Sequence, residues 1–168
     1  MTKASHRREN EDTAKSILGQ CLRAYTQRVS ESPLHGGCLC GGVRFELTEP
    51  PRSAGYCHCT RCQRRTGTAS SAQARVEGRT LRLLQGEELL RCWRHPDGGF
   101  EKCFCVECGS HLFGRNPDDR GQMSVRLGAF DGNPGIRPSF RTHVASAAAW
   151  EPIPDDGLER FKGATPRF

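Results

Sequence analysis

Apolar and polar residues alternate in short runs along most of the chain after position 36. The run VRFEL at 43–47 alternates strictly, so one face of a strand should be buried and the other exposed. Comparable runs predict further strands at 72–76, 80–84, 89–93, 100–104, 122–127 and 139–144. Segments rich in glycine and proline, among them EPPRSAG, NPDDRG and DGNPG, separate these runs. The pattern predicts a mainly β domain built from short strands.

The first 34 residues show a different, helical pattern. Their apolar positions recur with the spacing of one helix face, which predicts an amphipathic helix over about 12–30. These positions are Ile17, Leu18, Cys21, Leu22, Tyr25 and Val29. We therefore divide the chain into an N-terminal extension (1–34), a β domain (35–162) and a C-terminal tail (163–168). The apolar face of the helix could pack on the domain or on a second copy of the chain, which would give a homodimer.

Composition limits how such a domain can be stabilised. Hydrophobic residues make up 35% of the chain and aromatic residues 7%, which leaves a modest core, whereas the chain has 10 cysteines. No run of about 18 apolar residues is present, so no membrane span is expected. The N-terminus lacks the apolar segment of a secretory signal, so we expect a cytoplasmic protein. In a reducing compartment thiols bind metals more often than they pair, which makes disulfides the weaker explanation.

Most of the cysteines fall into three close groups, CLC at 38–40, CHCTRC at 57–62 and CFCVEC at 103–108. A short CxC or CxxC turn can direct its sulfurs at one ion, and zinc prefers four such ligands in a tetrahedron. Two turns from distant segments could thus form one closed structural zinc site that cross-links the fold. The cysteines assigned to this site are Cys38, Cys40, Cys105 and Cys108.

The CHCTRC group supplies a second candidate site from Cys57, Cys59 and Cys62. Three protein ligands leave one coordination position open, which is the pattern of a catalytic zinc. An open zinc can bind and activate a thiolate or polarise a carbonyl. Two alternatives remain. Cys92 or Cys103 could act as a fourth ligand and close the site, or the cysteines could hold an iron–sulfur cluster.

The histidines carry a weaker signal. His58 lies between two candidate ligands, and we expect its side chain to point away from the metal. His111 and His143 fall in predicted strands, where packing is the usual explanation. His35 and His95 fall in predicted loops and indicate no particular chemistry.

The chain has 25 Lys and Arg residues against 19 Asp and Glu residues, a formal net charge of +6. A solvated surface rich in arginine explains most of this charge. Arg61, Arg64 and Arg65 differ because they cluster beside the CHCTRC motif, and arginine forks suit carboxylates and phosphates. We take them as candidate contacts for the carboxylates of an anionic thiol. The aromatic residues are dispersed, so nucleic acid is not expected as a partner.

The segments GGCLCGGVRFEL, CHCTRCQRRTG, FCVECGSHLF and LGAFD follow one another, and a late Trp150 precedes DDGLERF. From about His35 to Phe161 the chain resembles the glutathione-dependent formaldehyde-activating enzyme family, which also contains centromere protein V. The resemblance implies a β-tent fold of antiparallel sheets around two zinc sites. It also implies that the four-cysteine zinc is structural and that the zinc on the CHCTRC motif is more labile and close to the substrate.

The activity implied by the resemblance is the condensation of formaldehyde with glutathione to S-hydroxymethylglutathione, a carbon–sulfur lyase reaction. The sequence departs from the family pattern in its long leader and near the late strand. Arg141 stands near the usual histidine, His143 is displaced, and Ala149 replaces a proline before Trp150. Cys103 is an additional thiol. These differences could alter the pocket rather than the fold.

Two functions remain open at this point. The first is a zinc-dependent enzyme that acts on adducts of a thiol, such as glutathione, with an aldehyde, such as formaldehyde. The alternative is a non-catalytic, zinc-stabilised module that binds glutathione or another protein. The shared motifs are chiefly metal ligands, so they specify the scaffold better than the substrate.

Overall fold

The computed structural model describes residues 33–165 of the chain. The helix predicted over 12–30 lies outside the described residues, as does the end of the predicted tail. The described part contains eleven strands in two sheets and one α-helix. Within this part, no helix is long and apolar enough to cross a membrane.

The small sheet has the strand order β1–β2–β5 and is antiparallel throughout. Its strands are β1 (Leu34–Gly37), β2 (Arg44–Leu47) and β5 (Leu81–Gln85). The predicted alternation is present in β2, where Phe45 and Leu47 are buried and Arg44 and Glu46 are less so. This sheet therefore has one buried face, as its sequence indicates.

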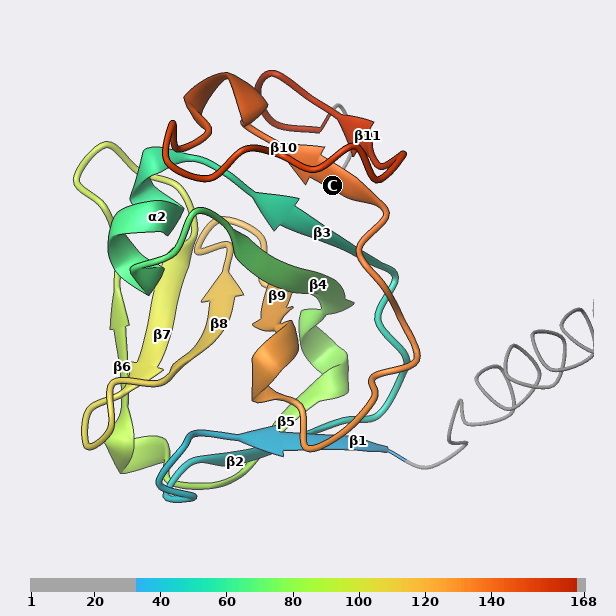
Figure 1. The fold of residues 1–168 in the computed structure, drawn as a ribbon. Helices are drawn as coiled ribbons and strands as arrows, with labels where there is room; N and C mark the ends of the chain where they lie inside the picture. Colours follow the sequence, from blue (N-terminus) through green and yellow to red (C-terminus); the bar gives the residue numbers. More distant parts are fainter. Residues whose placement is uncertain (1–32, 166–168) are drawn as a thin grey trace, which may run out of the picture. The chain divides into compact units, whose positions relative to one another are not determined.

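The large sheet has the strand order β11–β10–β3–β4–β9–β8–β7–β6. Its strands are β3 (Ser53–Cys57), β4 (Ser71–Glu77), β6 (Leu90–Trp93), β7 (Glu101–Cys105), β8 (His111–Arg115), β9 (Gln122–Arg126), β10 (Phe140–Thr142) and β11 (Glu159–Arg160). In Figure 1 the small sheet runs across one end of β6–β9. β10 pairs in parallel with β3 and β11, so this sheet is mixed rather than purely antiparallel. The long connection from β3 to β10 allows this pairing, because parallel neighbours need a crossover.

The alternating runs correctly predict β2, β4, β5, β6, β7, β9 and β10. β1, β3 and β11 were not predicted, because glycine, alanine or a very short length hides the period of two. His111 begins β8, as expected, but the placement of His143 in a strand is wrong. β10 ends at Thr142, and His143 takes a left-handed conformation with a φ of 55°.

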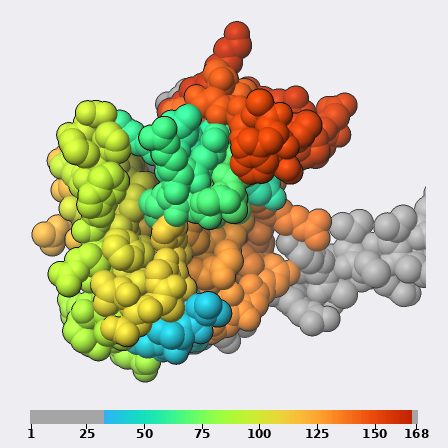
Figure 2. Space-filling view, turned by 60° about the vertical axis from the view of Figure 1, so that its left-hand side comes forward, coloured from blue at the N-terminus to red at the C-terminus, as the bar shows by residue number. Residues whose placement is uncertain are grey.

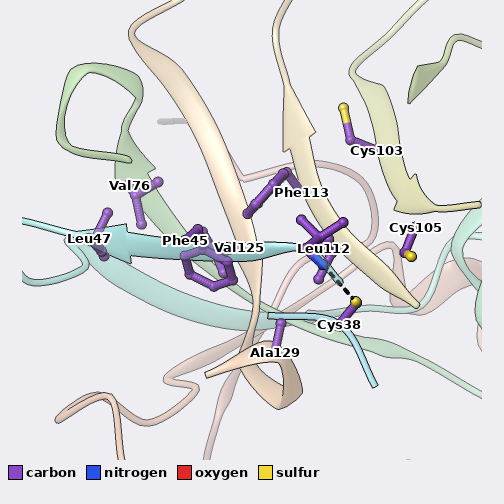
Figure 3. Packing of buried hydrophobic residues seen from close by; sticks show 11 residues of the cluster. Cys38, Phe45, Leu47, Val76, Cys103, Cys105, Leu112, Phe113, Val125 and Ala129 are labelled. Atoms are coloured by element: carbon purple, nitrogen blue, oxygen red, sulfur yellow. Dashed lines mark hydrogen bonds between the residues drawn. The ribbon is translucent and has the colours of Figure 1, made fainter. Parts of the chain in front are cut away.

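Phe45 lies at the centre of the hydrophobic core. Its ring meets Phe113 of β8 edge-on at 5.1 Å between centroids and Phe130 at 5.8 Å. Figure 3 shows Phe45 beside Phe113, Leu112 and Val125, so residues of both sheets share this cluster. A Cβ atom at Gly36 would come within 2.2 Å of a backbone oxygen and 2.3 Å of the Phe45 ring. Only glycine allows β1 to approach the core this closely.

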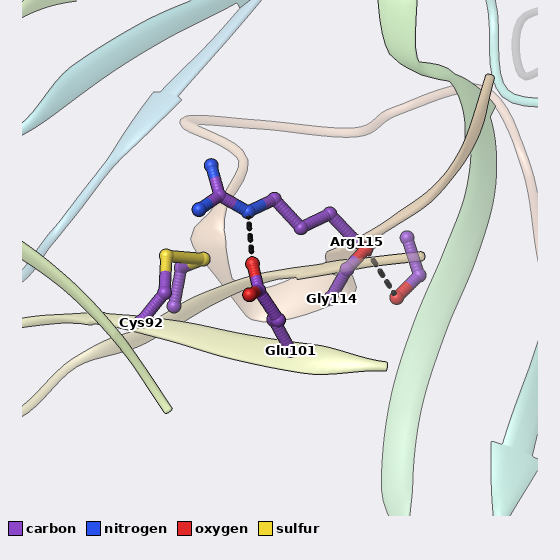
Figure 4. The surroundings of a disulfide bond; sticks show 6 residues. Cys92, Glu101, Gly114 and Arg115 are labelled. Atoms are coloured by element: carbon purple, nitrogen blue, oxygen red, sulfur yellow. Dashed lines mark hydrogen bonds and ion pairs between the residues drawn. A yellow bond between two sulfur atoms is a disulfide. The ribbon is translucent and has the colours of Figure 1, made fainter. Parts of the chain in front are cut away.

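A disulfide joins Cys92 of β6 to Cys103 of β7. The two residues are directly opposite each other in the antiparallel pair. Figure 4 shows the bond near the ion pair of Glu101 with Arg115, which links β7 to β8. Disulfides, the weaker explanation from the sequence, therefore do account for this one pair of cysteines.

We predict that Phe45→Ala lowers the free energy of unfolding by about 3–5 kcal/mol, since it removes a fully buried ring from the centre of the core. Urea denaturation followed by fluorescence measures the change. Leu84→Ala is the matched control, because Leu84 is 52% exposed and its loss should cost little. Equal losses in the two variants would contradict the placement of the core.

Candidate metal centres and the adjoining cleft

Four of the predicted ligands come together where the two sheets meet. The Sγ atoms of Cys38, Cys40, Cys105 and Cys108 all lie within 4.8 Å of one another. The Sγ atom of Cys40 is 3.4 Å from that of Cys38 and 3.8 Å from that of Cys105. Sulfurs bound to one zinc at about 2.3 Å in a tetrahedron lie about 3.8 Å apart, so the cluster fits a single ion of this size.

Two tight turns present these thiols. The first connects β1 to β2 and the second connects β7 to β8. Gly41 and Gly109 take φ values of 77° and 71°, a conformation that glycine adopts without strain. The backbone amide of Leu39 in the first turn donates to the hydroxyl of Ser110 beside the second, at 3.0 Å. The turns are therefore joined directly as well as through the sulfurs.

The second cluster holds the three cysteines of the CHCTRC motif. The Sγ atoms of Cys57, Cys59 and Cys62 lie within 4.8 Å of one another. Cys57 ends β3, and Cys59 is the N-cap of α2 (Thr60–Thr66). The Cys59 sulfur accepts a hydrogen bond from the backbone amide of Cys62 at 3.4 Å. The motif is thus not a simple loop, because the first turn of a helix sets the direction of its last sulfur.

Among the described residues, no fourth histidine, cysteine or carboxylate joins this second cluster. Cys92 and Cys103 are bonded to each other, so the alternative in which one of them closes the site is wrong. The second cluster therefore offers three sulfur ligands and leaves one position for another molecule.

The three clustered thiols share their protons unequally. Hydrogen bonds from Cys57 and Cys62 lower the pKa of Cys59 to about 2. The same contacts raise the pKa of Cys57, through Cys59, and the pKa of Cys62, through Cys57. Cys59 is thus the preferred thiolate, and a cation bound here would displace the protons of the other two.

A buried network fixes the backbone of the motif. His58 is buried and is not one of the clustered ligands, as expected, and its amide donates to the Thr142 carbonyl at 3.0 Å. Nη1 of Arg141 is 3.3 Å from Nε2 of His58, and Nη2 of Arg141 donates to Asp156 at 2.5 Å. The Arg141 guanidinium also covers the Tyr56 ring at 4.5 Å. Arg141 therefore contacts the CHCTRC segment through His58 and Tyr56, and it is not among the residues that line the cleft.

The second cluster opens into a cleft of about 950 Å³. Residues of α2, β6, β7 and the β6–β7 connection line it, together with His143 and Ser146. In Figure 2, the β6–β7 region (light green to yellow) lies beside the green α2 segment. The four-cysteine cluster contributes no residue to the cleft. Of the two clusters, the three-sulfur cluster is therefore the one that a molecule bound in this cleft could contact.

All three predicted arginines line the cleft, but their roles differ. Arg61 donates to Asp97 and to the carbonyl of Gly98, both at 3.1 Å, and so ties α2 to the opposite wall. Arg64 is exposed. Arg65 has buried Nη1 and Nη2 atoms with no hydrogen-bond partner among residues 33–165. Arg65 is therefore the best placed of the three to bind an anion.

Other residues of the cleft were not found from the sequence. Lys102 of β7 lies near the three thiols, and burial lowers its pKa. His143 lies close enough to help lower the pKa of Cys59. Gln73 of β4 and Trp93 of β6 complete the walls. Lys102, Gln73 and Trp93 lie on strands, so only the pairing register could have placed them.

Comparison with known proteins agrees with this geometry. The family model described as glutathione-dependent formaldehyde-activating enzyme matches residues 33–146. A Rhodobacter sphaeroides protein of known crystal structure is similar with a TM-score of 0.51 and 22% identity, over 76% of this chain and 98% of that chain. At this identity the likeness shows the fold alone. No curated protein matches the chain.

We predict a pH dependence of stability from His111, whose pKa is lowered by burial and by the charge of Arg65. Below the ordinary value of 6.5 the unfolded chain takes up a proton that the folded chain excludes, so stability falls as pH falls. His111→Gln should lose less stability than the wild type between pH 7.5 and 5.5 in urea denaturation. Parallel losses in both proteins would contradict this assignment.

Proposed function

Because the chain belongs to the glutathione-dependent formaldehyde-activating enzyme family, we propose that its cleft joins a thiol such as glutathione to an aldehyde such as formaldehyde. The observation that carries this proposal is the juxtaposition of three sulfur ligands with an unpartnered guanidinium in one cleft. The sulfurs suit the reacting end of an anionic thiol, and the guanidinium suits its carboxylate.

Zinc is the ion we propose for both clusters, since donor sets made only of thiolates favour it. The four-cysteine cluster would hold a structural ion, and Cys57, Cys59 and Cys62 would hold the second. When bound there, zinc supplies a positive charge that favours the thiolate form of an incoming thiol. We therefore expect two zinc ions per chain, of which the second is the more easily removed.

The chain's own residues bind and orient the substrate. Arg65 would take a carboxylate of the thiol in a bidentate contact, because its Nη atoms are otherwise unsatisfied. Arg64 adds positive charge at an exposed position of the same cleft. The pair of Arg61 with Asp97 holds the wall against α2, so that the thiol enters a defined space.

In the proposed addition, a bond forms between the thiol sulfur and the aldehyde carbon while the carbonyl π bond breaks. The proton of the thiol is transferred to the aldehyde oxygen, so the reaction needs no oxidant or reductant. His143 lines the cleft close to Cys59 and is positioned to move this proton. His143 has a left-handed backbone conformation, which is uncommon outside glycine and is found more often at functional sites.

The main test is Cys59→Ser. We predict that this variant retains one zinc per chain in the four-cysteine cluster and loses at least 100-fold in turnover of formaldehyde with glutathione. Turnover is measured above the uncatalysed reaction by NMR exchange between free and adduct species, and zinc by elemental analysis. The double variant Cys92→Ser/Cys103→Ser is the thiol control and should keep both zinc ions.

Retained turnover in Cys59→Ser would overturn the role of the three-sulfur site. A wild-type protein that binds glutathione and two zinc ions but shows no turnover would instead favour the non-catalytic binding module.

A second prediction separates recognition from chemistry. Arg65→Met should raise the KM for glutathione at least tenfold and leave the KM for 2-mercaptoethanol unchanged, because the smaller thiol has no carboxylate. Arg64→Met is the matched control and should change both values by less than about twofold, since an exposed charge contributes little. Equal effects of Arg65→Met on both thiols would exclude the carboxylate contact.

A further inference from the structure

A second cavity, of about 530 Å³, lies apart from the thiol cleft. The C-terminal end of α2 with the segment that follows it, the end of β9 and the turn after β1 line it. The two cavities have no lining residue in common. In Figure 2 the α2 segment (green) and the segment after β9 (orange) are visible on the same face. This second cavity has no part in the proposed thiol chemistry.

Its notable feature is Arg126, the last residue of β9, which is 6% exposed. Nη1 of Arg126 donates to the Ser71 hydroxyl and to Oε1 of Gln73, at 2.7 Å for the glutamine. Nε and Nη2 are buried and have no hydrogen-bond partner among residues 33–165. A buried guanidinium with two unsatisfied donors is costly unless a ligand or water pairs with it.

Among the described residues that line the cavity, no carboxylate is free to pair with this guanidinium. Asp131 is the carboxylate that lines the cavity, and both of its oxygens bind the guanidinium of Arg44. That contact lowers the pKa of Asp131, which keeps it ionised and paired. The positive charge of Arg126 is therefore uncompensated within the cavity.

The position of the unsatisfied donors indicates the chemistry of the ligand. Nε and Nη2 form the side edge of a guanidinium, where two parallel N–H bonds match the two oxygens of a carboxylate. Ser71 and Gln73 hold the opposite edge, so the fork is fixed in orientation before a ligand arrives. We propose that this cavity is a second ligand site, in which Arg126 binds a small monocarboxylate.

The remaining polar groups favour a monoanion over phosphate. The Thr66 hydroxyl donates to the Cys62 carbonyl at 2.8 Å, and the Thr68 hydroxyl donates to the Ser70 carbonyl at 2.6 Å. The protons of these two hydroxyls are thus already used, and Arg44 is paired with Asp131. Among residues 33–165, Arg126 is the arginine of this cavity that keeps unpaired donors. The charged donors on offer are thus one guanidinium edge, which matches the charge of a monoanion better than that of a dianion.

Space for the organic part of the ligand is available beside Gly128. A Cβ atom built at Gly128 meets nothing within 4 Å, and its φ is not positive. A larger side chain is therefore accommodated at this lining position without backbone strain, and its Cβ atom meets no atom of Arg126. Gly128→Leu is a variant that blocks the site and leaves the guanidinium in place.

The test is a titration of the full-length, zinc-loaded protein with sodium acetate against sodium chloride at equal ionic strength. The readout is the side-chain Nε–H resonance of Arg126 in a ¹⁵N NMR spectrum, assigned by its loss in Arg126→Met. We expect a saturable shift with acetate in the wild type and at least tenfold weaker binding in Gly128→Leu. Inorganic phosphate should also bind at least tenfold more weakly than acetate.

Three outcomes would overturn the proposal. The first is a shift that does not saturate or that chloride reproduces, which would mean that water satisfies the guanidinium. The second is unchanged acetate affinity in a folded Gly128→Leu, and the third is phosphate binding as tight as that of acetate. The two cavities share no lining residue and the titration does not read thiol turnover, so this test is independent of the proposed thiol chemistry.

Discussion

The convergence of four thiols from turns 65 residues apart is the constraint on which the rest of the domain depends. One turn follows β1 of the small sheet and the other follows β7 of the large sheet, so the cluster fixes how the two sheets meet. Cys38 and Cys105 are also members of the hydrophobic core around Phe45. Closing so long a loop carries an entropic cost, and a bound ion at this junction would offset it where apolar burial is modest.

The two clusters both consist of cysteine sulfurs, but they differ in the number of sulfurs and in their access to the cleft. In the first, two rigid turns bring together four sulfurs that lie apart from the thiol cleft. In the second, a strand end and a helix start provide three sulfurs on the wall of a cleft. Arg65 and Lys102 lie close to the second set of thiolates and favour their negative charge. The cluster with three sulfurs is thus also the one that borders the cleft and has positively charged side chains beside it.

The sequence predicted features that depend on local spacing. The period of two located strands such as β2, and the CxC and CxxC spacings located both clusters correctly. Features that depend on strand pairing could not be predicted from local spacing. The Cys92–Cys103 disulfide is one of them, because it follows from the register of β6 with β7. The same limit hid Lys102 and Gln73 in the cleft. His143 was misplaced because the strand stops at Thr142 for reasons of hydrogen bonding, not of local pattern.

Helix α2 carries both candidate metal ligands and the arginines of the cleft. It has only seven residues, which is too short to be stable by its own hydrogen bonds, and its N-cap is Cys59, one of the three candidate metal ligands. The arginines that face the cleft lie on the same short helix. Loss of an ion bound there would therefore weaken the element that carries the arginines of the cleft. Under the proposed function, coordination and recognition of an anionic thiol would form one cooperative unit, and the affinity for that thiol would report whether the ion is bound.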